Sequence, residues 1–178
     1  MRKRIKTLIV AVALLAPGAV AQASGALLPL AQQGDWIALA HHPSMIAPPD
    51  VCIATTPTSH GAFLFWTDGA SLEARILNNS WSLPSNVTGN IEIKVPGADV
   101  TLPVSANTNT VVGAEIGLHA FRKLVAAMND ADSMTVTVGK AAPTSVSLNG
   151  STVVMRAFET CADIPASTQA PKGANPFK

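Results

Sequence analysis

The most regular feature between residues 34 and 150 is the alternation of apolar and polar side chains. Apolar residues recur at about every second position in short segments, which is the period of a β-strand with one buried face. The pairs Asp68-Gly69 and Pro96-Gly97 stand between such segments and are typical of hairpin turns. The pattern predicts strands over 34–42, 51–56, 62–67, 71–78, 91–95, 98–104, 133–139 and 144–150.

Two other segments have the spacing of amphipathic helices. Apolar residues at helical intervals predict a first helix over about 114–129, namely Ile116, Ala120, Phe121, Leu124, Val125 and Met128. The stripe of a second helix, over about 152–161, consists of Val154, Ala157, Phe158 and Cys161. We expect Ser151 or Thr152 to cap this second helix, because a hydroxyl can accept from its free N–H groups.

These elements together predict a β-rich α+β domain. Residues 105–113 are polar and lack a period, so a loop is expected there. Many short strands with frequent turns, and only two helices, favour an antiparallel β-sandwich-like domain to which the helices are added.

The N-terminus has the order of a secretory signal peptide. Basic residues at positions 2–6 precede an apolar run over 7–16, and Ala21-Gln22-Ala23 forms a small-x-small cleavage pattern. The run is shorter than the roughly 20 residues that cross a bilayer, so a membrane anchor is disfavoured. We therefore expect a signal peptide over 1–23 that is cleaved near Ala23, one domain over 24–163 and a disordered Pro-rich tail over 164–178.

Cleavage changes the charge of the protein. The whole chain has 12 Lys+Arg and 11 Asp+Glu; 4 of the basic residues lie in the signal, which leaves 8 against 11 and a net charge of −3. This balance gives no electrostatic reason to expect nucleic acid as a partner. A periplasmic or secreted location is expected, with no transmembrane segment after cleavage and no cofactor. The expected partner is a protein or a component of the cell envelope or host surface.

The two cysteines are candidates for a structural disulfide. Cys52 and Cys161 both follow the signal, and an exported chain meets an oxidising environment. A bond would close a loop of about 110 residues and tie the second helix to an early strand, with up to ~4.7 kcal/mol of stabilisation in the chain-entropy description. Two free thiols are the alternative. No C-x-x-C spacing indicates a redox or zinc site.

Four features together resemble one family. They are Gly34-Asp35-Trp36 soon after the signal, Cys52 after a short loop, the segment LNNSWSLPSN, and the terminal stretch SVSLNGSTVVMRAFETC. In this combination the chain resembles exported bacterial proteins of the invasion-associated locus B type. The resemblance implies a β-rich periplasmic or surface domain that is linked in some members to host-cell invasion, and it implies no catalytic residues.

Two sets of side chains are candidates for functional sites. His41, His42 and Met45 offer imidazole and thioether ligands for a periplasmic copper site, although adjacent strand residues point to opposite faces. Ser59, His60 and Asp68 have the residue types of a hydrolase triad, without the Gly-x-Ser-x-Gly elbow. Neither set is assigned as a metal or catalytic site.

The aromatic residues admit two interpretations. They form either a ligand-binding face or part of the core, and we favour the core; the residues concerned are Trp36, Phe63, Phe65, Trp66 and Trp81.

The favoured function is that of a non-enzymatic exported accessory or interaction protein. A periplasmic copper-binding protein is the first alternative and a hydrolase the second.

Overall fold

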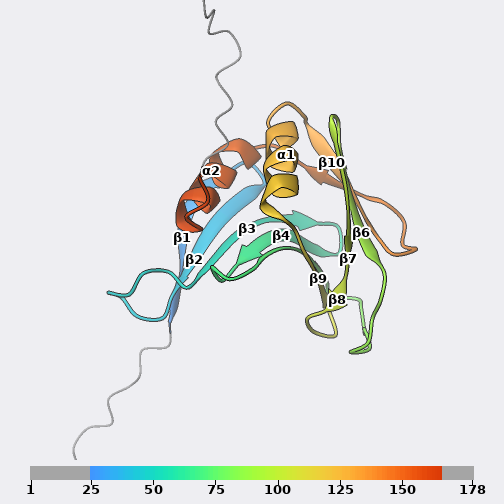
Figure 1. Cartoon of the computed structure of the whole chain (residues 1–178), viewed down its shortest axis with the longest axis horizontal. Coiled ribbons are helices and arrows are strands. Elements are labelled where there is room, and N and C mark those ends of the chain that lie inside the picture. Colours follow the sequence, from blue (N-terminus) through green and yellow to red (C-terminus); the bar gives the residue numbers. More distant parts are fainter. Residues whose placement is uncertain (1–24, 166–178) are drawn as a thin grey trace, which may run out of the picture.

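Two antiparallel sheets and two helices make up the part of the chain, residues 25–165, that the computed structural model describes (Figure 1). The larger sheet has the strand order β1 (Ala26–Gln33), β2 (Trp36–His42), β3 (Val51–Thr58), β4 (Gly61–Thr67), β5 (Leu72–Asn78), β9 (Val111–Glu115) and β8 (Ser105–Ala106). The smaller sheet has the order β11 (Thr144–Ser147), β10 (Ser133–Val138), β6 (Asn90–Val95) and β7 (Ala98–Pro103). The predicted β-rich, sandwich-like α+β fold is confirmed.

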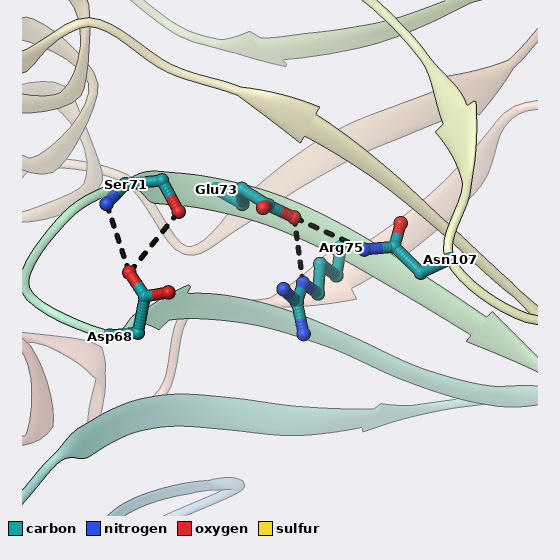
Figure 2. A network of polar contacts seen from close by, with 5 residues as sticks. All are labelled: Asp68, Ser71, Glu73, Arg75 and Asn107. Carbon is teal, nitrogen blue, oxygen red and sulfur yellow. Dashed lines mark hydrogen bonds and ion pairs between the residues drawn. The ribbon is translucent and has the colours of Figure 1, made fainter.

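The predicted hairpins form where turn residues allow tight reversals. Between β4 and β5 the Asp68 carboxylate accepts hydrogen bonds from the backbone N–H of Ser71 (Figure 2) and from that of Ala70, both at 3.0 Å. Gly69 supplies the positive φ of 83°. Gly97, with φ 91°, does the same between β6 and β7. These turns set the register in which Phe65 faces Ala74 and Ile93 faces Val100.

The core lies between the inner faces of the two sheets and two helices. Helix α2 (Ser151–Cys161) packs against β1, β2 and β3, while α1 (Leu118–Met128) packs against β6, β7 and α2 (Figure 1). Phe65 lies at the centre, with its ring centroid 5.0 Å from Phe63, 5.3 Å from Phe121 and 6.5 Å from Phe158. The expected core role of Trp36, Phe63 and Phe65 is therefore confirmed, since each is 0% exposed.

The predicted disulfide is present. Cys52 on β3 is bonded to Cys161 at the end of α2, with the two Cα atoms 6.0 Å apart. Cys161 lies at the end of the apolar stripe of α2, where Val154 and Phe158 are fully buried. The bond therefore fastens the last helix to the larger sheet.

The start of α2 depends on backbone geometry rather than on a hydroxyl cap. Gly150 is the residue before the helix, with φ 86°, and no side chain caps the helix, so the expectation of a Ser151 or Thr152 cap is wrong. A Cβ at Gly150 would collide with the carbonyl oxygen of Gln33. The turn between β1 and β2 lies so close to the helix start that only glycine fits there.

Strand pairing corrects several boundaries. The sequence predicted a loop up to residue 113 and a helix from residue 114. Residues 111–115 instead form strand β9, because they pair with Leu77 to Glu73 of β5. Helix α1 therefore begins at Leu118, four residues later than expected. The predicted loop also contains the short strand β8, and β2 begins at Trp36 because Gly34 turns with φ 54°.

Strand β1 was not predicted at all. Its side chains are almost all exposed, and a register shift between Pro29 and Ala31 breaks any alternation.

The predicted signal peptide lies outside the described residues, as does the predicted tail except for Ile164 and Pro165. Ile164 packs against the core, and the Pro165 carbonyl accepts a hydrogen bond from Arg122 at 3.1 Å. Among residues 25–165, neither helix has the length and apolar character needed to span a bilayer.

Candidate functional site

A cavity of about 440 Å³ opens between the two sheets. It lies where the β3–β4 turn and the end of β5 face β10, β11 and the loop that joins them. Its volume falls in the range of roughly 300–1,000 Å³ that is usual for small-ligand sites. Residues from both sheets meet here, so the cavity exists only because the sheets are packed together.

The floor of the cavity is apolar and belongs to the core. Phe63 and Ile76 come from the larger sheet, and Val136 and Val146 come from the smaller one. All four are buried, and the Phe63 ring is held edge-on by Trp36 at 6.3 Å and by Phe65 at 5.0 Å. Close packing on the far side gives these groups little freedom, so the floor has a fixed shape.

The rim of the cavity is polar and comes from separate segments. Ser59 and His60 form the β3–β4 turn, Thr144 and Ser145 begin β11, and Asn78 ends β5. The turn is tied down because the His60 carbonyl accepts a hydrogen bond from the Asn79 N–H at 3.0 Å. The rim therefore has a defined set of hydroxyl, amide and imidazole groups.

Asn78 and Trp81 leave donors available at the rim. The Asn78 side-chain oxygen accepts hydrogen bonds from the Ser80 N–H at 2.9 Å and the Ser80 hydroxyl at 2.7 Å, which fixes the orientation of the amide. Within residues 25–165, no hydrogen bond involves the side-chain nitrogen Nδ2 of Asn78 or the indole nitrogen of Trp81. Both are therefore available to a ligand that carries an acceptor.

The proposed hydrolase triad is not assembled around this cavity. Ser59 and His60 line it, but Asp68 lies beyond the opposite end of β4, and a strand of that length spans roughly 20 Å. Asp68 instead holds the β4–β5 turn, and the backbone N–H groups of Ser71 and Ala70 keep its pKa below the ordinary value. In the part of the chain that the structure describes, no carboxylate lines the cavity.

The copper candidates do not converge on one point. His41 Nδ1 lies 2.6 Å from the Asp50 carboxylate, and this hydrogen bond is the main reason why the pKa of Asp50 is below its ordinary value. His42 Nδ1 lies 3.0 Å from the Ala47 carbonyl oxygen. Adjacent residues of β2 point to opposite faces, and Met45 is 92% exposed in the following loop. Over residues 25–165 no group of three or more His, Cys, Asp and Glu side chains has metal-binding geometry.

A second polar cluster lies on the outer face of the larger sheet, away from the cavity. Arg75 contacts the Glu73 carboxylate at 2.8 Å, and its guanidinium carbon lies 3.6 Å from the centre of the Trp66 ring. Asn107 also donates to Glu73, at 3.4 Å (Figure 2). Trp66 is therefore half-buried outside the core, and Arg75 covers one face of its ring. The cluster stabilises the sheet through a cation–π contact and an ion pair.

Sequence reasoning identified only part of the cavity. It considered Ser59 and His60 for catalysis and Trp81 for a binding face, but did not join them to Asn78, Thr144 or the valines of β10 and β11. A local signal could have suggested Asn78-Asn79-Ser80 as an Asx turn, since Asn side chains often bind the backbone two residues on. The approach of β11 to β3 has no such signal.

Comparison with protein-family models, curated proteins and solved structures found no match for this chain. The resemblance to the invasion-associated locus B type stays a prediction.

Proposed function

We propose that this protein is a non-enzymatic accessory or interaction protein of the bacterial periplasm or cell surface, and that it contacts its partner at the cavity between the sheets. The observation that carries the proposal is the composition of this cavity. It combines a rigid apolar floor with a polar rim, and none of the described residues that line it has a carboxylate to orient His60 as a base. Such a lining suits binding.

The disulfide supports an exported location. A bond between Cys52 and Cys161 is compatible with an oxidising compartment, which is the environment that a cleaved signal over 1–23 would deliver. The resemblance to the invasion-associated type points in the same direction and suggests a role in contact with host cells. The copper alternative is less favoured, because His41 and His42 diverge and each already has a partner for Nδ1.

The proposal is tested by site-specific photocrosslinking in cells that export the protein. A photoreactive residue replaces Ala142, which is exposed at the mouth of the cavity, and the matched control replaces Ala70, which is exposed in the β4–β5 turn. We expect a discrete adduct in the periplasmic or surface fraction from position 142 and none from position 70. Identical adducts at both positions, or retention of the protein in the cytoplasm, would contradict the proposal.

A further inference from the structure

We infer that the cavity between the sheets binds a small uncharged amphipathic molecule. An aromatic or aliphatic body would lie on the floor, and a carbonyl, ether or hydroxyl oxygen would meet the rim. The inference rests on the proposed function, because it uses the same cavity, and it adds the chemical class of the ligand that the cavity binds. Three properties of the lining lead to it.

The first property is the apolar character of the floor. Phe63, Ile76, Val136 and Val146 present hydrocarbon from both sheets, and their exposed fractions are between 0% and 8%. Water that enters the cavity meets the exposed part of this apolar surface. A ligand with an apolar body of matching size would displace that water, which is the main source of affinity in cavities of this kind.

The second property is the scarcity of charge. Among residues 25–165, no Lys, Arg, Asp or Glu side chain lines the cavity, and His60 is the one ionisable residue in the lining. A charged ligand that enters would lose hydration without meeting a fixed opposite charge, which is unfavourable. The lining therefore selects against ionised molecules.

The third property is the set of donors at the rim. The Asn78 amide nitrogen is oriented by the bonds that Ser80 makes to the amide oxygen, and the Trp81 indole nitrogen can only donate. Thr144 and Ser145 line the cavity from the other sheet. A neutral ligand with an acceptor oxygen satisfies these donors, while a pure hydrocarbon leaves them unpaired.

Two dyes that differ by one charge test the inference on the mature, disulfide-bonded protein. N-phenyl-1-naphthylamine is uncharged, and 8-anilinonaphthalene-1-sulfonate has the same ring system with an added sulfonate. Their fluorescence rises on transfer to an apolar site. We expect saturable binding of the neutral dye at one site, and binding of the sulfonate weaker by at least about tenfold because the charge is uncompensated. A neutral dye bearing an acetyl group should bind more tightly than the parent dye, since it supplies an acceptor.

Matched variants locate the binding. Ala142→Trp fills the mouth of the cavity and should abolish binding, while Ala70→Trp adds the same side chain at a distant turn and should preserve it. Ser59→Trp blocks the mouth from the opposite sheet, and it serves as a second test if Ala142→Trp folds poorly.

The outcomes separate this inference from the proposed function. Equal affinity for both dyes, no saturable binding, or binding that survives both Ala142→Trp and Ser59→Trp would overturn the inference. If crosslinks at position 142 persist in that case, the proposed interaction site stands and its occupant is a protein surface. If the neutral dye binds as expected but position 142 gives no adduct in cells, the ligand class stands and the proposed partner contact fails.

Discussion

Replacing both Cys52 and Cys161 with alanine should weaken the fold without changing it. The two positions are 109 residues apart, so the bond removes much of the freedom of the unfolded chain. A loop of this length corresponds to about 4.7 kcal/mol in the chain-entropy description, and loss of a native disulfide from a small exported domain typically costs about 2–5 kcal/mol. We expect a loss in that range, which is a large share of a total of roughly 5–15 kcal/mol.

The native structure should survive the substitution because α2 has other contacts. Val154, Met155 and Phe158 are at most 1% exposed and hold the helix against the sheet. The variant should therefore keep its circular dichroism spectrum at 25 °C. Each kcal/mol of lost stability lowers the melting temperature of a domain of this size by roughly 2–4 °C.

Urea denaturation of the mature protein and of the double alanine variant measures the effect. The slope of the unfolding free energy against urea should rise in the variant, because an unfolded chain without the cross-link exposes more surface. Reduction of the native protein, followed by blocking of both thiols, serves as a second route to the open chain. A loss below about 1 kcal/mol, well under the range expected for this loop, or two reactive thiols in protein isolated from the periplasm, would refute the reasoning.

Two further predictions concern ionisable groups. Burial raises the pKa of Glu159 above its ordinary value, against the opposing effect of Arg122 and Arg156, and its Oε1 has no hydrogen-bond partner within the described residues. The folded state therefore holds the proton more tightly than the unfolded state, and the free energy of unfolding should fall as the pH rises from about 4.5 through the folded pKa. Glu159→Gln should remove this pH dependence of the unfolding free energy and stabilise the protein at pH 7, as measured by thermal unfolding between pH 4.5 and 8. Equal pH dependence of stability in both proteins would argue against a buried carboxyl. Copper titration followed by calorimetry should give the same weak binding for the mature protein and for the His41→Ala/His42→Ala variant, whereas tight binding that only the variant loses would support the copper alternative.

The unexpected strands show where reading the sequence was insufficient. Strand β9 has almost no alternation, because Val112, Gly113 and Ala114 are all buried, and the side chains of Glu73 and Asn107 lie over Gly113 on the outer face. Strand β1 is an exposed edge strand, so its leucines follow no burial pattern. Periodicity reports burial on one face, and neither strand has a single buried face along its whole length.

Local patterns in the sequence determined the central hairpins, the apolar stripes of both helices and the pairing of Cys52 with Cys161. Each depends on neighbouring residues, on turn chemistry, or on there being only two cysteines. The tertiary structure decided how the strands divide between two sheets, since β6 and β7 leave the larger sheet and β9 returns to it. It also decided where the cavity forms, because Ser59, Asn78 and Thr144 come together only when the two sheets pack. Contacts between residues so distant in sequence depend on the packing of the whole domain.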